Sequence, residues 1–118
     1  MSDTVSAAAT CIELSSIDDL TKLLSEKRNI VLDFHATWCL PCKMVGKILG
    51  DMSLELASYS ACVVRINVDN FQELASKYVV RSIPTLIFLN LGSVESTGIL
   101  VGAVTKSQIQ QALAKYFE

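Results

Sequence analysis

Charged side chains are scarce in this chain: they make up 19% of its 118 residues, whereas 51% are hydrophobic. This balance excludes intrinsic disorder, which requires low hydrophobicity and high net charge. The net charge is only −2, so no basic field exists to attract nucleic acid or anionic lipid. Five glycines and two prolines exclude collagen-like and linker-like sequence. We therefore expect a single domain over residues 1–118, with residues 1–10 forming a loose N-terminal segment.

The chain also lacks a long hydrophobic run. Its mean hydropathy is +0.42, yet clusters such as the LIFL of residues 86–89 have only the length of a strand. A membrane-spanning helix needs roughly 18 apolar residues, so we expect no membrane segment. The N-terminal MSDTVSAAATC has neither the apolar core of a secretory signal nor the arginines of a transit peptide. We expect a cytoplasmic protein, and a cleaved organelle leader preceding this sequence stays open.

Cysteine and histidine are few, with four and one copies respectively. Four cysteines do not make a disulfide scaffold at this length. Cys39 and Cys42 form a CxxC pair, which is either a redox dithiol or half of a zinc site. A structural zinc site needs two further ligands at paired spacing, whereas Cys11 and Cys62 are single and the one histidine is His35. We expect a redox dithiol, no metal, and two small buried hydrophobic residues in Cys11 and Cys62.

Hydrophobic periodicity and breaker residues predict alternating strands and helices. Capping boxes at Asn70–Glu73 and Thr105–Gln108 are expected to open two of the helices. The predicted strands are 10–14, 30–36, 62–68, 85–91 and 94–101, and the predicted helices are 16–27, 39–58, 70–78 and 105–116. The order β-α-β-α-β-α-β-β-α predicts an α/β fold with a central mixed β-sheet flanked by helices on both faces.

The CxxC pair lies between a predicted core strand and the first turn of a helix. Unpaired N–H groups and the helix dipole favour an anion there, so we expect a lowered pKa for Cys39. Cys39 is then the exposed nucleophile, and Cys42, one turn further, is the buried resolving thiol. Pro41 suits the first turn because no N–H partner is needed at that point. Lys43 adds positive charge nearby.

A buried resolving thiol needs a base, and Asp33 is the candidate. It lies inside the apolar run of residues 31–34 (VLDF), where desolvation should raise the pKa of a carboxyl group. A perturbed acid that leads into a redox turn is a functional candidate. We expect Arg65, on the neighbouring predicted strand, to lie close enough to moderate the shift.

These residues resemble the active-site segment of the thioredoxin family, over residues 33–44 (DFHATWCLPCKM). Residues 81–85 (RSIPT) resemble the family's cis-proline loop, and residues 101–103 (VGA) resemble its glycine after the closing hairpin. The resemblance covers about residues 12–117, with the elements in the family's order. It implies a thioredoxin fold and a protein-disulfide reductase with Cys39 as nucleophile, Cys42 as resolver and Asp33 as proton acceptor.

The resemblance also implies the partners of the site. A cis bond between Ile83 and Pro84 would present the Ile83 backbone beside the dithiol, so that a target segment pairs there as an added strand. Electrons would come from NADPH through a thioredoxin reductase, with no cofactor bound to this chain. The expected partners are this reductase and disulfide-containing proteins, and the chain is expected to be a monomer. The implied docking rim comprises Trp38, Leu40, Pro41, Ile83, Pro84, Thr85 and Gly102.

Three positions depart from the family pattern. Leu40 stands where glycine is usual, which leaves the reduction potential and the choice of partners open. His35 stands where an aromatic or small residue is common. Lys47 replaces a helix-kinking proline, so we expect a straighter helix. Three alternatives remain at this point. They are an oxidase or isomerase, distinguished by its reduction potential, a docking subunit whose dithiol is dispensable, and a zinc module, distinguished by metal analysis of the reduced protein.

Overall fold

The centre of the protein is a five-stranded mixed sheet, seen in a computed structural model that describes residues 11–117. The strand order is β1-β3-β2-β4-β5, in which β1 and β2 run parallel to β3, and the β2–β4 and β4–β5 pairs are antiparallel. The predicted loose segment 1–10, and with it the first residue of predicted strand 10–14, lies outside the described residues. The strands are β1 (Cys11–Glu13), β2 (Asn29–His35), β3 (Ala61–Asn67), β4 (Thr85–Leu89) and β5 (Ser96–Val101).

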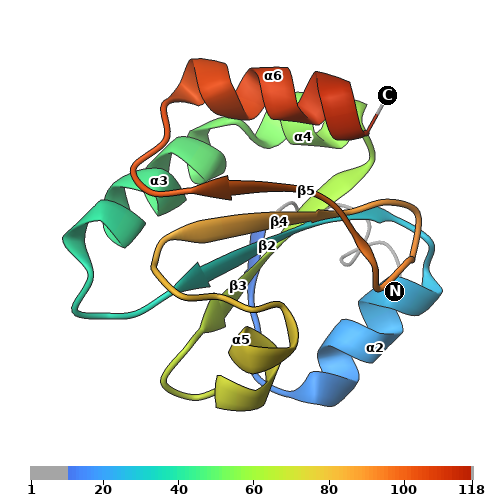
Figure 1. Cartoon of the computed structure of the whole chain (residues 1–118). Helices are drawn as coiled ribbons and strands as arrows, with labels where there is room; N and C mark the ends of the chain where they lie inside the picture. Colours follow the sequence, from blue (N-terminus) through green and yellow to red (C-terminus); the bar gives the residue numbers. More distant parts are fainter. Residues whose placement is uncertain (1–10, 118) are drawn as a thin grey trace.

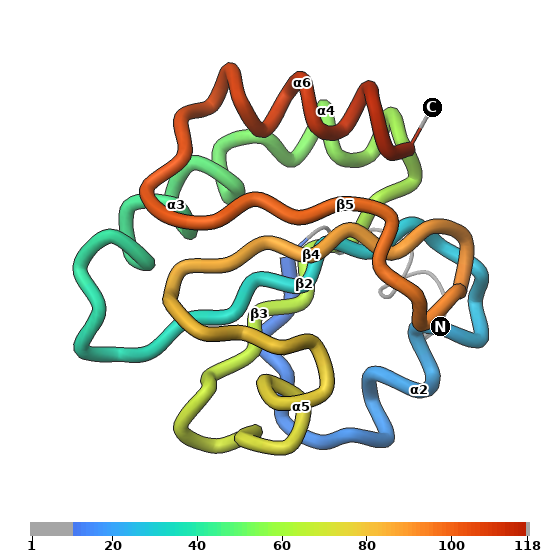
Figure 2. Tube along the Cα trace, viewed as in Figure 1, coloured from blue at the N-terminus to red at the C-terminus, as the bar shows by residue number. Residues whose placement is uncertain are grey.

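Helices cover both faces of this sheet. Figure 1 shows α3, α4 and α6 on one face, and α2 and α5 on the other. The trace in Figure 2 follows the chain from β5 back over the sheet into α6, which lies beside α4; a hydrogen bond from Gln110 to Glu55 joins these two helices. The predicted α/β architecture with a mixed sheet is confirmed. The helices are α2 (Ile17–Ser25), α3 (Leu40–Asp51), α4 (Ser53–Ser58), α5 (Gln72–Lys77) and α6 (Lys106–Tyr116).

The predicted helix 39–58 is two helices. The first, α3, continues through Lys47 to Asp51, and α4 begins after Met52. Met52 leaves the helical conformation (φ −100°, ψ 22°), and its N–H donates to the Leu49 carbonyl in the tighter pattern of a helix end. Gly50 lowers helix propensity just before the break, while the buried Met52 side chain anchors it in the core.

Several further boundaries differ from the prediction by one or two residues, and the structure gives a physical reason for two of them. The capping box at Asn70–Glu73 does not form: α5 starts at Gln72 with Phe71 as an N-cap that makes no side-chain hydrogen bond. The reason is a turn at Asn67, whose carbonyl accepts from the N–H groups of both Asn70 and Phe71. The predicted strand 85–91 ends early, at Leu89, because the Leu91 N–H donates to the side chain of Asn29. By contrast, the capping box at Thr105–Gln108 is formed.

The core lies in two layers, one on each side of β2, which is buried along its whole length. Successive strand residues point to opposite faces. Leu32 and its alternate neighbours therefore pack toward α2 and α5, and Val31 packs toward α3 and α6. Within residues 11–117, no helix is long and apolar enough to cross a membrane. Because β2 is packed on both faces, it forms a rigid support for residues 36–39, which lead from its end to the CxxC pair.

Candidate redox-active site

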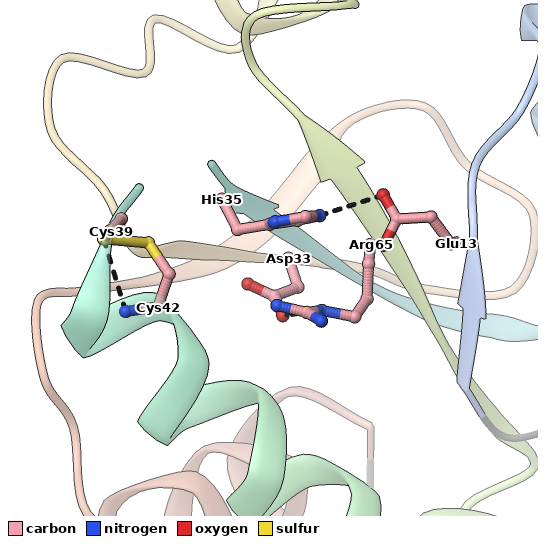
Figure 3. Close-up of polar contacts among 6 residues, drawn as sticks. All are labelled: Glu13, Asp33, His35, Cys39, Cys42 and Arg65. Atoms are coloured by element: carbon pink, nitrogen blue, oxygen red, sulfur yellow. Dashed lines mark hydrogen bonds and ion pairs between the residues drawn. A yellow bond between two sulfur atoms is a disulfide. The ribbon is translucent and has the colours of Figure 1, made fainter. Parts of the chain in front are cut away.

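A disulfide joins Cys39 and Cys42 at the N-terminus of α3 (Figure 3). Cys39 is the N-cap of the helix, and its Sγ accepts the N–H of Cys42 at 3.3 Å. Pro41 occupies the first turn, where a missing N–H leaves no helical bond unmade. The Cys39 N–H donates to the Ala36 carbonyl, which turns the chain from β2 into α3. The sulfur of Cys39 therefore lies where a helix stabilises negative charge.

The two sulfur-bearing residues are buried to different extents. Cys42 has no exposed surface, whereas Cys39 is 6% exposed. The prediction of an exposed Cys39 is wrong for the disulfide form, because Cys39 packs in a small cluster with Ala36 and Ile83. The Ile83 carbonyl oxygen is 4.0 Å from Cys39 Sγ. Of the two cysteines, only Cys39 reaches the surface at all.

Exposed hydrophobic side chains surround this point. Trp38 is 70% and Leu40 67% exposed. The Trp38 indole N–H donates to Asp69 Oδ2 at 3.0 Å, which holds the ring beside the dithiol. Trp38 and Ile83 also line a surface hollow of about 210 Å³. Pro41 is exposed as well.

A second segment closes the site from the β4 side. The Ile83–Pro84 bond is cis, and the Pro84 carbonyl accepts the Gly102 N–H at 2.9 Å. Gly102 has φ +94°, and a Cβ added there would meet no atom within 4 Å. Thr85 is buried, pairs with Val101 and donates its hydroxyl to the Ser82 carbonyl. The backbone after β5 is thus held against the loop before β4.

Asp33 lies on the face of β2 that packs toward α3, with no exposed surface. Arg65 Nε donates to its Oδ2 at 3.0 Å, and its Oδ1 has no hydrogen-bond partner within residues 11–117. Burial raises the pKa of the Asp33 carboxyl, while the charge and hydrogen bond of Arg65 lower it. The structure therefore brings Asp33 and Arg65 together, as the sequence predicts, with one carboxylate oxygen left to accept a proton.

Arg65 fits because α3 carries a glycine opposite it. A Cβ on Gly46 would lie 2.9 Å from Arg65 Nη2. The arginine side chain remains 24% exposed, so its charge extends from the carboxylate toward solvent. Lys43 is exposed on α3, and its side chain makes no hydrogen bond or ion pair with another residue in the range 11–117. The cation that moderates the pKa of Asp33 is Arg65, as the sequence predicts.

Sequence reasoning missed the partner of His35. The His35 Nε2 lies 2.9 Å from Glu13 Oε2, with side-chain exposures of 8% and 52%. The pairing depends on β1 adding to β3 with Glu13 opposite Arg65, which no local pattern reveals. An acid in an otherwise apolar edge strand is the one signal that points to it. Sequence reasoning also missed Asp69 and Gly46.

The remaining cysteines lie apart from the dithiol. Cys62 is buried, as predicted, and burial raises its pKa to about 11. Cys11 is exposed on the edge strand β1, so the prediction that it is buried is wrong. An edge strand has a neighbour on one side only, which leaves the side chain in contact with solvent. Across residues 11–117, no cluster of three or more Cys, His, Asp or Glu side chains could hold a metal ion.

An α/β fold in which a CxxC disulfide caps a helix above a buried carboxylate defines a thiol–disulfide oxidoreductase. The Thioredoxin family model matches residues 13–115. Thioredoxin from Haemophilus influenzae is 42% identical over 80 residues, which is 68% of this chain and 72% of that protein. Thioredoxin from Mycoplasmoides gallisepticum is 35% identical over 95 residues, covering 80% of this chain and 91% of that protein.

Solved structures of thioredoxins have the same fold as this chain. A thioredoxin mutant from Halobacterium salinarum superposes with a TM-score of 0.80 at 28% identity, covering 95% of this chain and 94% of that one. Reduced thioredoxin from Schistosoma mansoni gives 0.78 at 34% identity, covering 92% and 99%. The chain belongs to the thioredoxin family, and its CxxC pair makes it a protein-disulfide reductase.

Proposed function

We propose that this chain opens target disulfides with Cys39 as the attacking thiolate and Cys42 as the resolving thiol. The observation that carries the proposal is the unequal burial of the two cysteines of one disulfide at a helix N-cap. Cys42 is fully buried, so a target can approach only Cys39, the residue that retains exposed surface. The family assignment supports the same roles.

In the first step, the Cys39 thiolate attacks one sulfur of the target disulfide. The Cys39–target bond forms, the target's own S–S bond breaks, and its other sulfur leaves as a thiolate. The helix N-terminus and the Cys42 N–H, which reaches Cys39 Sγ in the disulfide form, favour the thiolate over the thiol.

In the second step, Cys42 resolves the mixed disulfide. Its proton passes to the free Oδ1 of Asp33, and the resulting thiolate attacks Cys39 Sγ. The Cys39–Cys42 bond forms, the Cys39–target bond breaks, and the target sulfur leaves with the electron pair and takes a proton from solvent. Asp33 suits this role because burial raises its pKa, so that it accepts a proton more readily than an exposed carboxylate.

We place target docking on the rim around Cys39. No intrachain hydrogen bond from the Ile83 backbone N–H is found within residues 11–117, and its carbonyl faces Cys39. An extended target segment can pair with that backbone. The apolar side chains of Trp38, Leu40 and Pro41 offer contacts on one side, and the Thr85 and Gly102 segments bound the other.

The cycle needs a source of electrons after each turnover. We propose that a thioredoxin reductase fed by NADPH supplies them in the cytoplasm, and that the chain works as a monomer. No prosthetic group is required, because the two sulfurs of Cys39 and Cys42 carry the electron pair between the partners.

The test is reduction of insulin disulfides driven by NADPH and thioredoxin reductase. We expect turnover by the wild type and none by Cys39→Ser. Cys42→Ser should accumulate a mixed disulfide with the target, because the resolving thiol is missing. Cys11→Ser is the matched control, since it removes an exposed thiol from β1, and it should retain wild-type turnover. Absence of turnover in the wild type would overturn the proposal.

The reduction potential decides between reduction and the oxidase or isomerase alternative. A value near about −270 mV is that of a reductase, and one between about −180 and −120 mV is that of an isomerase or oxidant. We expect the former.

A further inference from the structure

Beside the dithiol, three neighbouring strands present ionisable side chains on one face of the sheet. The register places Glu13 opposite Arg65, and Arg65 opposite Asp33. His35 follows Asp33 by two residues on β2, so its side chain projects to the same face. In Figure 3 the His35 ring points toward Glu13, and their contact is 2.9 Å. The contacts His35–Glu13 and Arg65–Asp33 join these four groups in pairs within one cluster.

We propose that His35, held by Glu13, is a positioning residue for the resolving step: its protonated imidazole keeps Asp33 ionised at acidic pH. The inference rests on the proposed function, in which Asp33 accepts the Cys42 proton. His35 touches neither sulfur in this role. It acts on the charge of Asp33.

The charges around Asp33 explain why an imidazole has this effect. Arg65 faces it from β3, His35 from its own strand, and Glu13 and Cys11 from β1. Leu86 pairs with Asp33 from β4, and α3 carries the buried Cys42, which is a titratable thiol in the reduced protein. With both carboxylates ionised and the arginine charged, this cluster carries one net negative charge if the imidazole is neutral. Protonating the imidazole brings the net charge to zero.

A proton entering the cluster as the pH falls has two destinations. If it binds Asp33, the resolving thiol loses its base. If it binds His35, the base survives, and the new cation stabilises it. The interaction of charges is stronger in a buried site than in water. In agreement, the charge of His35 lowers the pKa of Asp33, against the larger raising effect of burial.

Glu13 gives the imidazole its orientation. Its half-exposed carboxylate accepts a hydrogen bond from the buried ring. A charge-assisted hydrogen bond of this kind is stronger than a neutral one. Imidazole is the side chain whose ordinary charge change falls at about pH 5 to 8. No proton passes from His35 to Cys42 or Asp33 in the resolving step.

The decisive variant is His35→Gln, because a glutamine amide can donate to Glu13 without carrying charge. The rate of mixed-disulfide resolution is measured from about pH 5 to pH 8 in a single turnover. In a plot of this rate against pH, we expect the acid limb, where the rate falls as the pH falls, to move to higher pH. At about pH 5.5 the rate should fall about three- to tenfold, as for a limb displaced by about half to one pH unit, with little change at about pH 8. Glu55→Gln, which removes a carboxylate from α4, is the matched control and should keep the wild-type profile.

A second readout does not depend on catalysis. The carboxyl carbon signal of Asp33 in the oxidised protein is followed by NMR as a function of pH. Its midpoint should move to higher pH in His35→Gln. If the wild type resolves no mixed disulfide, the proposed function fails while this titration still tests the inference. An unchanged midpoint in His35→Gln would overturn the inference, and so would an unchanged acid limb.

The part played by Glu13 is tested by a double-mutant cycle on the same midpoint. Glu13→Gln removes a repelling charge, which alone lowers the midpoint of Asp33. In the His35→Gln background only this direct effect remains. In the presence of His35, Glu13→Gln also removes the carboxylate that stabilises the protonated imidazole. The midpoint of Asp33 should therefore fall less than in the His35→Gln background. Equal shifts in the two backgrounds would overturn the coupling between Glu13 and His35.

Discussion

The face of β2 that packs toward α2 and α5 consists of Ile30, Leu32 and Phe34, all fully buried. Its other face comprises Asn29, Val31, Asp33 and His35, of which Val31 lies in the core under α3 and α6. Neighbouring residues on one strand thus have opposite surroundings. One face stabilises the fold by burying apolar surface. The other accepts the cost of buried polar groups near the dithiol.

The strongest challenge to this contrast is Leu32→Ala. Removing a fully buried leucine should lower the free energy of unfolding by about 2–5 kcal/mol, from lost burial and the cavity left behind. Urea unfolding measures the loss. At a temperature where the variant is folded, its rate of disulfide reduction should stay within about twofold of the wild type, because Leu32 points away from the dithiol. A loss below about 1 kcal/mol would mean that this face does not carry the stability assigned to it.

The next residue along the strand should behave in the opposite way. Burial raises the pKa of Asp33, so the folded protein binds this proton more tightly than the unfolded chain. The contribution to stability is therefore greatest in acid and is lost as the pH rises from the ordinary value of 3.8 through the folded pKa. Asp33→Asn should show a higher free energy of unfolding at about pH 7 and a flatter dependence on pH, measured by urea unfolding across that range.

The same variant should resolve the mixed disulfide slowly. A positioned base contributes about 10²–10⁴-fold, so a slowing on the order of 10²-fold is expected. Quenched-flow trapping of the mixed disulfide measures it. A variant that gains stability and keeps its rate would remove Asp33 from the mechanism while leaving the contrast in stability intact.

Local patterns predicted one part of this contrast and not the other. The apolar run that becomes β2, the CxxC turn and the acid within that run can each be recognised within about ten residues, and so the sheet and the dithiol could be predicted. Glu13 lies 22 positions from His35, and their contact exists only because β1 adds to β3 in one register. The break between α3 and α4 at Met52 has the same origin. The sequence pattern predicted one continuous helix, whereas burial of Met52 in the core places the break there. Such contacts between distant segments are what sequence periodicity does not encode.

A matched pair of glycines on α3 sharpens the comparison at smaller amplitude. The Cβ added by Gly50→Ala would meet no atom within 4 Å, so the free energy of unfolding should rise by about 0.5–1 kcal/mol from helix propensity. Gly46→Ala should gain less, because its Cβ would lie 2.9 Å from Arg65 Nη2 and move the guanidinium away from Asp33. The midpoint of the Asp33 NMR titration should rise in Gly46→Ala only. Identical midpoints and equal gains would show that Arg65 is not confined by the helix.

The two single cysteines give the finest probe, because they lie on opposite faces. Cys62 belongs to the apolar layer with Leu32, whereas Cys11 is exposed on β1, in register with Val63 of the other layer. With Cys39 and Cys42 both changed to serine, iodoacetamide at about pH 8 should label Cys11 first. A pKa of about 11 leaves on the order of one thiolate in a thousand for Cys62, and burial excludes the reagent as well.

Labelling of Cys62 should therefore be at least about 10²-fold slower and should report opening of its layer rather than intrinsic reactivity. Desolvation beside the sheet raises the pKa of Cys11 too, with Arg65 opposing the shift, so its rate should be below that of a free thiol yet insensitive to opening. Adding Leu32→Ala weakens only the layer that contains Cys62. That change should accelerate labelling of Cys62 and leave the rate at Cys11 unaltered. Equal acceleration at both thiols would mean that the two faces open as one unit. The two faces of β2 would then differ in the chemistry of their side chains but not in local stability.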